Sequence, residues 1–422
     1  MPDIIPTDVD IAIDKEAFEK LDSLILQIAS RHNVEIIQKI WHGYHKCAYI
    51  LSPLEIDERF RLQLDFFTDF SAKGYPNLLP SRLLLENKKQ YKNFFIPTAE
   101  IEYPFLVMRR ILKNDLKKDH IEKMKILVEQ ASTNIRKNLE GIFGEAISDS
   151  IRELTKLEDK NKFRDQIKDY RNALRKWSKK NTSFGYMLQY GIAQFKRIIQ
   201  RLLHSVGFSI VLLGPDGSGK STIGNLLLER VSGSFHGGRI QYWRPYLLPS
   251  MGKLKFWNPS EEVATNPNPH KHPKQNFIKS SIRFLYYVVD YILGYPVKIY
   301  WAKVRKHIII FDRYYYDYLV DLQRYQFNIP GFLVKLILPF IPSPDLTIYL
   351  DAEPEVLHER KQELSLPELE RQVHEFRKVL PAIPNARRVS TNRPVEDVVK
   401  DISYLILKEK SLQTKRLLRR AD

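Results

Sequence analysis

With 422 residues, the chain is too long for one ordinary domain and suits two or three. Its apolar fraction of 43% is that of a folded protein with complete cores, and its one cysteine, Cys47, excludes a disulfide framework and is typical of a reducing compartment. The net charge of +17 favours polyanionic or phosphorylated partners.

The N-terminus has no basic segment followed by an apolar stretch, so we expect no secretion signal and a cytoplasmic protein. Two apolar stretches, at 283–298 and 331–342, are interrupted by Asp290, Lys335 and prolines. Both are shorter than the ~20 apolar residues that a membrane span needs. We predict core helices here, with attachment to a membrane surface as the alternative.

Residues 1–115 alternate between strand-like and helix-like patterns. Apolar residues spaced by three and four predict a helix over 16–31, between a short strand at 8–13 and three further strands at 34–39, 45–51 and 59–67. This mixture predicts an α+β domain.

Three carboxylates of this region form a candidate metal site. Asp8 and Asp10 alternate on the first strand and so face one side, and Asp65 lies on a later strand. Such a triad can hold two Mg²⁺ ions for attack on the α-phosphate of a nucleotide. The region resembles the nucleotidyltransferase fold, although Pro6-Thr7 stands where that family has Gly-Ser and the chain begins just before the acidic pair. Simple turn acids are the alternative.

Residues 116–205 are charged, free of proline and helical in period. The high charge of segment 156–180 predicts a solvated helix or linker. Basic residues concentrate here and in the tail 411–422. They indicate either a solvated helix surface or a weak contact with nucleic acid or an anionic membrane; no nucleic-acid-binding motif accompanies them. Residues 206–410 form a third region.

The third region opens with the pattern GxxxxGK[ST] at 214–221, between an apolar strand at 208–213 and a helix at 222–231. The glycines let backbone N–H groups point at phosphate oxygens, the lysine reaches the β- and γ-phosphates, and the serine hydroxyl binds Mg²⁺. We therefore predict ATP and Mg²⁺ as cofactors, bound by Gly214, Asp216, Gly217, Ser218, Gly219, Lys220, Ser221 and Thr222.

Further strands are predicted at 239–245, 307–312, 345–352 and 387–391, alternating with helices. Such alternation predicts a doubly wound parallel sheet with its ligands at the carboxyl ends of the strands. Arg244, Asp312 and Arg313 follow such ends. Asp312 is a candidate Mg²⁺ ligand with Ser221, and Arg313 can clamp an acceptor phosphate. A helix-capping acid and a surface ion pair are the alternatives.

The phosphate loop, Asp312-Arg313-Tyr314 and the stretch 344–356 together resemble the thymidylate kinase family. This resemblance implies a fold of the nucleoside monophosphate kinase type. It implies that Asp216, Arg244 and Arg313 face the acceptor, and that 360–371 is a mobile lid whose arginines, Arg360 and Arg371, close on the transferring phosphoryl group. Segment 391–394, with Asn392 and Arg393, resembles the loop that packs on adenine. The predicted catalytic residues are Lys220, Asp312, Arg313, Arg360 and Arg371.

The sequence departs from that family where thymidine would be recognised. After Arg244-Pro245 the expected Gly-Gly-Thr is absent, no Ala-Tyr-Gln follows Asp312-Arg313, and 249–272 is a long insertion. A phosphorylated acceptor attacks without losing a proton, whereas an alcohol needs a carboxylate base, for which Asp216, Asp317 and Asp321 are candidates. The two predicted arginine clamps favour a phosphorylated acceptor.

The predicted function is therefore ATP- and Mg²⁺-dependent phosphoryl transfer to a nucleoside monophosphate or another small phosphorylated acceptor. A kinase of sugars or other alcohols in surface-carbohydrate synthesis is one alternative. A nucleotide-gated scaffold that binds nucleic acid or membrane is another. The expected partner is a small molecule that accepts the phosphate. The sequence leaves open whether the protein forms a homodimer.

Overall fold

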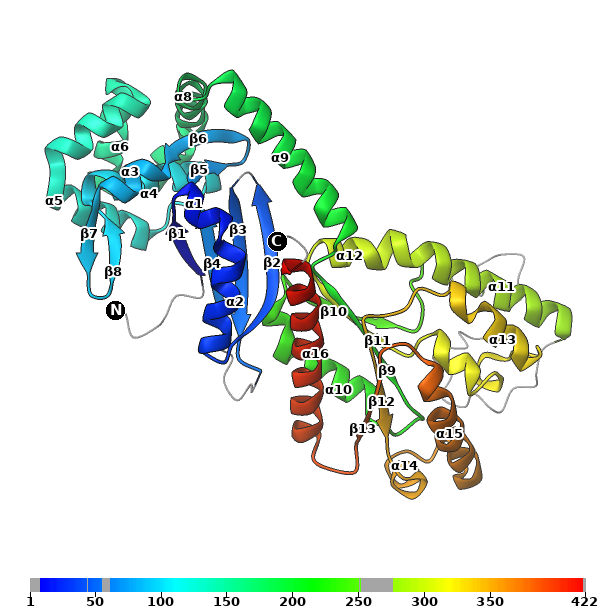
Figure 1. The fold of residues 1–422 in the computed structure, drawn as a ribbon. Coiled ribbons are helices and arrows are strands. Elements are labelled where there is room, and N and C mark those ends of the chain that lie inside the picture. The colour runs from blue at the N-terminus through cyan, green and yellow to red at the C-terminus, as the bar shows by residue number, and fades with distance from the viewer. Residues whose placement is uncertain (1–7, 44, 55–60, 250, 252–275, 420–422) are drawn as a thin grey trace. The chain divides into compact units, whose positions relative to one another are not determined.

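The computed structural model describes residues 8–43, 45–54, 61–249, 251 and 276–419 (Figure 1). Most of the predicted insertion at 249–272 and the end of the tail lie outside these residues. The chain divides into two compact units: Met1–Ile28, Ile40–Tyr49 and Gln63–Ile199 form the first, and Ala29–Lys39, Ile50–Leu62 and Gln200–Asp422 form the second. The boundary predicted at 115 falls inside the first unit, and the predicted domain limits stay predictions.

The N-terminal sheet has four strands in the order β1-β4-β3-β2: β1 (Asp8–Ala12), β2 (Glu35–Gly43), β3 (Lys46–Ser52) and β4 (Leu62–Phe67). Strands β1 and β4 are parallel, with Asp10 opposite Asp65. The helix predicted over 16–31 is divided at Lys20 into α1 (Lys15–Glu19) and α2 (Leu21–Arg31). Helix α2 buries Leu21, Ile25 and Ala29, because residues four apart share one face.

Two short antiparallel pairs follow that the sequence patterns did not predict. They are β5 (Asp69–Ala72) with β6 (Tyr75–Pro80), and β7 (Lys88–Tyr91) with β8 (Phe94–Pro97). Between the pairs lies α3 (Ser81–Glu86), and α4 (Ala99–Lys113) comes after them. Strand β7 is exposed along its whole length, so it lacks the alternation of apolar and polar residues that marks a half-buried strand.

The predicted helical region consists of α5 (Lys118–Phe143), α6 (Glu145–Leu157), α7 (Lys160–Asp165), α8 (Ile167–Lys180) and α9 (Phe184–Leu203). The prediction of a solvated helix or linker at 156–180 is wrong, because Phe163, Tyr170 and Leu174 are buried in the same core as α4 and α5. A few apolar side chains at helical spacing anchor a segment that is otherwise highly charged.

The second unit is built on a five-stranded parallel sheet in the order β10-β11-β9-β12-β13. Its strands are β9 (Phe208–Leu213), β10 (Gly238–Tyr242), β11 (Ile308–Asp312), β12 (Leu346–Asp351) and β13 (Ala386–Ser390). Each of the five predicted strands is present. The predicted doubly wound parallel fold of the C-terminal region is confirmed.

Helices cover both faces of this sheet. One core joins the sheet to α10 (Lys220–Val231) and α16 (Val395–Leu418). The other lies between the sheet and α11 (Phe277–Gly294), α13 (Gly331–Ile337) and α15 (Leu366–Val379). The remaining helices are the short α12 (Trp301–Val304) and α14 (Pro354–Arg360), and single turns lie at Ser232–Ser234, Tyr295–Tyr300, Tyr315–Leu319, Gln323–Tyr325, Leu338–Phe340 and Leu380–Ala382.

The described residues include the start of the predicted tail and the first of the two apolar stretches. The tail predicted from residue 411 begins inside α16, whose buried side chains include Ser411, Thr414 and Leu418. The apolar stretch at 283–298 lies on α11 and the turn after it, and α11 buries Phe284, Tyr287 and Tyr291. Across the described ranges, we find no helix with the length and apolar character needed to span a bilayer.

Candidate active site

The phosphate loop links the buried strand β9 to helix α10. Gly217 has a φ of +85°, and a Cβ placed on it would approach the Leu357 carbonyl oxygen to 2.6 Å. Gly219, with a φ of +86°, precedes the first residue of α10. Glycine alone adopts a positive φ at these positions without strain, and at Gly217 it alone fits beside the Leu357 carbonyl oxygen. The loop therefore keeps its backbone N–H groups unobstructed at the N-terminus of a helix, where anions bind.

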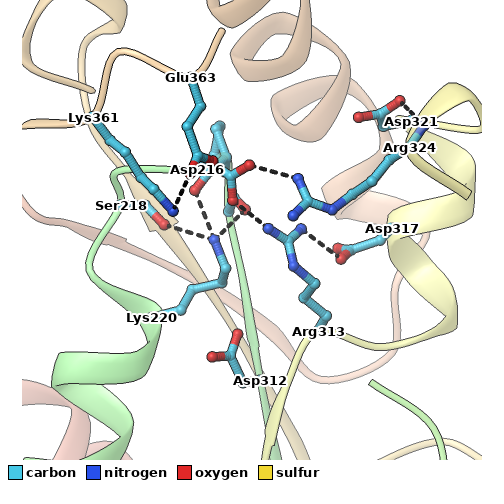
Figure 2. Close-up of polar contacts among 12 residues, drawn as sticks. Asp216, Ser218, Lys220, Asp312, Arg313, Asp317, Asp321, Arg324, Lys361 and Glu363 are labelled. Atoms are coloured by element: carbon cyan, nitrogen blue, oxygen red, sulfur yellow. Dashed lines mark hydrogen bonds and ion pairs between the residues drawn. The ribbon is translucent and has the colours of Figure 1, made fainter. Parts of the chain in front are cut away.

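Lys220 is buried and lies folded along the loop (Figure 2). Its Nζ donates to the carbonyl oxygens of Gly214, at 2.8 Å, and Pro215, at 2.7 Å. Burial, reinforced by the Arg313 charge, lowers the pKa of Lys220 to about 8. An anionic phosphate bound beside Lys220 would favour the charged ammonium form and so raise this pKa.

Ser221 and Asp312 are joined by a hydrogen bond in which the Ser221 hydroxyl donates to Asp312 Oδ2 at 2.6 Å. Asp312 ends β11, the strand next to β9. Among the described residues no group of three or more Asp, Glu, His or Cys side chains could hold a metal ion. One hydroxyl and one carboxylate nevertheless suit Mg²⁺, which commonly takes few protein ligands and fills its shell with phosphate oxygens and water.

Asp216 is held between two arginines (Figure 2). Arg313 Nη2 donates to its Oδ1, and Arg324 Nη1 donates to its Oδ2 at 2.5 Å. Burial by itself would raise the pKa of Asp216, but the charges of Arg313, Lys220 and Arg324 outweigh it and hold the pKa well below its usual range. Asp216 is therefore an anion, and it accepts from one terminal nitrogen of each arginine.

Arg313 has a φ of +76°, which is strained for an arginine and is held in place by its surroundings. Its Nη1 donates to Asp317 Oδ2 at 3.2 Å, and the Tyr325 hydroxyl donates to the same oxygen at 3.2 Å. Burial raises the pKa of Asp317 against the opposing effect of Arg313. Asp317 Oδ1 is buried with no hydrogen-bond partner in the described structure. This carboxylate is the one nearest to Arg313 after Asp216.

The predicted lid contributes the last residue of α14 and residues from the segment between α14 and α15. Arg360, Lys361 and Glu363 reach the site, and Lys361 pairs with Glu363 at 3.0 Å. Arg360 Nη2 donates to the Thr391 carbonyl oxygen at 2.9 Å. Arg371, on α15, instead pairs with Glu368 and donates to the Val320 carbonyl oxygen.

These groups surround a cavity of about 700 Å³. Its lining brings together residues from the phosphate loop, two strand ends, a turn and the lid: Asp216, Gly217, Gly219, Lys220, Ser221, Thr222, Tyr242, Asp312, Arg313, Arg324, Arg360, Lys361 and Glu363. Sequence reasoning missed Tyr242, Arg324, Lys361 and Glu363. Tyr242 lies within a predicted strand and ends β10, and the two lid residues follow Arg360 closely in the chain, but no local pattern distinguished Arg324.

Arg244, predicted to face the acceptor, is not among the lining residues. Its side chain is 1% exposed, and its Nη1 donates to Asp290 Oδ2 at 2.7 Å and to the Leu248 carbonyl oxygen at 3.0 Å. The guanidinium carbon also lies 4.3 Å from the centre of the Tyr246 ring. A contact with an acceptor phosphate would require this buried ion pair to open.

The remaining predicted residues also lie outside the lining. Asp321 accepts from the Arg324 backbone N–H and from Gln372, each at 3.0 Å, so it supports the turn that carries Arg324. Arg393 pairs with Asp401 at 2.5 Å, and Asn392 is exposed. The predicted adenine contact of this segment stays a prediction.

In the N-terminal sheet, Asp10 and Asp65 face each other across β1 and β4, but cations accompany them. Arg109 pairs with Asp10, and His42 Nε2 lies 3.6 Å from Asp65 Oδ1. Burial raises the pKa of Asp65. With Asp8 they do not form a group that could hold a metal ion. The structure thus gives no support to the predicted metal site, and the resemblance to nucleotidyltransferases stays a prediction.

Fold and site together define a P-loop α/β domain of the kinase type. Residues 274–402, from α11 to α16, match the profile of the thymidylate kinase family, so the C-terminal half of the chain is thymidylate kinase-like. The matched segment contains Asp312, Arg313, Arg324 and the lid, and it begins after the phosphate loop. A nucleotide kinase activity in general is what this match supports.

Solved thymidylate kinases resemble part of the chain. The enzyme from Candida albicans is 19% identical, with a TM-score of 0.34, over 49% of this chain and 93% of that one. The enzyme from Ehrlichia chaffeensis is 18% identical, with a TM-score of 0.33, over 47% of this chain and 98% of that one. No curated protein matches the chain.

Proposed function

We propose that the C-terminal domain transfers the γ-phosphate of ATP, with Mg²⁺, to a nucleoside monophosphate or another small phosphorylated acceptor. The observation that carries this proposal is one cavity in which a phosphate loop and two acceptor-side arginines lie around the same carboxylate, Asp216. A donor and an acceptor can therefore meet within a single site.

The donor side consists of the loop, Lys220, Ser221 and Asp312. The backbone N–H groups of the loop and the Lys220 ammonium would hold the β- and γ-phosphates. Ser221 and Asp312 would hold Mg²⁺, which neutralises charge that builds on the phosphate oxygens when it is bound. The fit rests on the direct contact between the Ser221 hydroxyl and the Asp312 carboxylate, which both line the cavity.

The acceptor side consists of Arg313 and Arg324. Both guanidinium groups point at Asp216, and each retains donors that this carboxylate does not use. An arriving phosphate monoester would accept from these donors in the forked geometry that arginine suits. Its oxygen needs no base, so positioning and charge neutralisation suffice for the transfer. Arg324 thus takes the second position that the sequence assigned to Arg244.

The lid side consists of Arg360, at the end of α14, and Lys361, which line the cavity; Lys361 is paired with Glu363. Arg360 donates to the neutral Thr391 carbonyl oxygen, which does not cancel its charge. It can approach a transferring phosphoryl group when the segment moves inward. Arg371 is bound to Glu368 and would have to leave it to do the same.

The test is an assay with γ-labelled ATP against nucleoside monophosphates, sugars and sugar phosphates. We expect a labelled product from a phosphorylated acceptor, and we expect Lys220→Ala to abolish it because the main clamp on the γ-phosphate is lost. Full activity of folded Lys220→Ala protein would refute the proposal. A labelled product from neutral alcohols alone would replace it with the sugar kinase alternative. ATP hydrolysis that only nucleic acid or vesicles stimulate would favour the scaffold.

A further inference from the structure

The first unit contains a second cavity, of about 410 Å³, that the kinase function does not use. It is formed by the end of β2, the start of β3, the turn between β5 and β6, and one side of α9. Ten residues line it: His42, Gly43, Lys46, Ser71, Ala72, Lys73, Gly74, Tyr190, Gln194 and Arg197. Lys46, Lys73 and Arg197 have basic side chains, and His42 adds an imidazole ring. None of these described lining residues is acidic.

Two of the cations keep their charge uncompensated. Lys73 Nζ donates to the Leu112 carbonyl oxygen at 2.6 Å, and Arg197 Nη1 donates to the His42 carbonyl oxygen at 2.9 Å. A carbonyl oxygen satisfies a hydrogen bond but cancels no charge. In addition, Arg197 Nε is buried and has no partner among the described residues. A buried donor without a partner is costly, so a ligand that accepts from it is favoured.

The third cation differs, because carboxylates surround it. Asp10, Asp65 and Asp69 act on Lys46, and burial lowers its pKa despite them. Lys46 thus lies in the field of these acids, of which Asp10 pairs with Arg109 and Asp69 accepts from the Ser71 hydroxyl. None of the three acids is a lining residue, so the positive charge of Lys73 and Arg197 meets no opposing carboxylate in the lining.

Two glycines of the lining play different parts. Gly43, with a φ of +155°, lets Gln194 approach the backbone, since a Cβ there would come within 2.7 Å of Gln194 Nε2, whereas a Cβ on Gly74 would meet nothing within 4 Å. Gln194 adds a neutral amide donor beside the two cations, whereas the Ser71 hydroxyl already donates to Asp69. Small residues, neutral donors and cations are the composition of an oxyanion site.

We propose that this cavity binds a small molecule that carries a phosphate group, that Lys73 and Arg197 supply the charge, and that no metal ion is required. This proposal is independent of phosphoryl transfer at the phosphate loop. Its lining residues differ from Asp8, Asp10 and Asp65, the acids predicted to bind a metal ion.

The experiment titrates pyrophosphate into the full-length chain by calorimetry, in EDTA. The Lys220→Ala variant is used throughout, so that the phosphate loop contributes little. We expect one binding event, and we expect Lys73→Gln and Arg197→Gln each to weaken it about tenfold or more, because each removes a charge-assisted hydrogen bond. Lys92→Gln, which removes a lysine from the turn between β7 and β8, is the matched control and should bind like the parent.

Thermal melting checks that each variant is folded. If Arg197→Gln does not fold, Lys73→Gln decides, because Lys73 lies on an exposed turn. No heat of binding in the Lys220→Ala parent would overturn the proposal, as would equal binding by Lys73→Gln and Lys92→Gln. Binding that appears only when Mg²⁺ replaces EDTA would also overturn it, since the site would then depend on a metal.

Discussion

The Ser221 hydroxyl donates a 2.6 Å hydrogen bond to the Asp312 carboxylate, although 91 residues separate them in the chain. Ser221 lies in the first turn of α10 and Asp312 ends β11, so neighbouring elements of the parallel sheet bring them together. A P-loop hydroxyl and a strand-end carboxylate are the kinds of ligand with which P-loop NTPases hold Mg²⁺.

Asp312→Asn should lower kcat about a hundredfold and raise the Mg²⁺ concentration needed for half-maximal rate. The amide keeps the shape and can still accept from Ser221, but it lacks the negative charge that attracts the ion. Steady-state rates across a Mg²⁺ titration measure both effects. Asp397→Asn, at an exposed position on α16, is the control. An unchanged Mg²⁺ dependence in Asp312→Asn would remove Asp312 from the site.

Arg324→Gln should raise the KM for the phosphorylated acceptor roughly tenfold or more and leave the KM for ATP nearly unchanged. The variant loses the fork on the acceptor side, whereas the phosphate loop is untouched. Initial rates with each substrate varied in turn separate the two constants. Arg387→Gln removes an exposed arginine paired with Glu409 and should behave like the parent. Equal changes in both KM values would point to a structural effect on Asp216 instead.

ATP binding should weaken about tenfold between pH 7 and pH 9, because the pKa of Lys220 in the folded protein is about 8. This pKa is lowered from 10.5, so the ammonium that attracts the triphosphate is lost as pH rises through 8. Calorimetry in buffers of different ionisation enthalpy should detect proton uptake on binding above pH 8.

A second buried lysine, Lys410 on α16, also has a pKa lowered to about 8 by burial. It lines neither cavity, so Lys410→Met should leave the pH dependence of ATP binding as it is. An affinity that stays flat from pH 7 to pH 9 in the parent would show that Lys220 is already charged throughout this range.

Arg244→Gln should lower the free energy of unfolding by about 3–5 kcal/mol, because it leaves the Asp290 carboxylate buried without its ion partner. The double variant Arg244→Met with Asp290→Leu should be less destabilised, since no lone charge remains. Chemical denaturation measures all three proteins. If Arg244 contacts the acceptor instead, Arg244→Gln would raise the acceptor KM with little loss of stability.

Structural features that depend on a few neighbouring residues were predicted correctly from the sequence. The phosphate loop and the five strands of the parallel sheet came from apolar runs that end in glycine or charged residues, and all five strands are present. The hairpins β5–β6 and β7–β8 were not predicted, because their strands are short and partly exposed. Segment 156–180 was misinterpreted, since three buried side chains outweigh its many charges.

The site residues likewise divide into those that local sequence predicts and those that depend on tertiary contacts. Lys220, Ser221 and Asp312 were predicted from motif and strand position, and they meet in the cavity. Arg324 could not be found that way, because it depends on how the turns Tyr315–Leu319 and Gln323–Tyr325 lead the chain back to Asp216. Arg244 was assigned to the acceptor because Asp290, on α11, could not be foreseen as its partner.

The sequence by itself determined that the C-terminal region holds a phosphate loop on a parallel sheet, because glycine spacing and apolar periodicity act over a few residues. Only the tertiary structure decided which charges face a ligand and which cancel one another. The reason is that a side chain's charge acts through its neighbours in space, and for Asp216 and for Lys73 those neighbours lie many residues away in the chain.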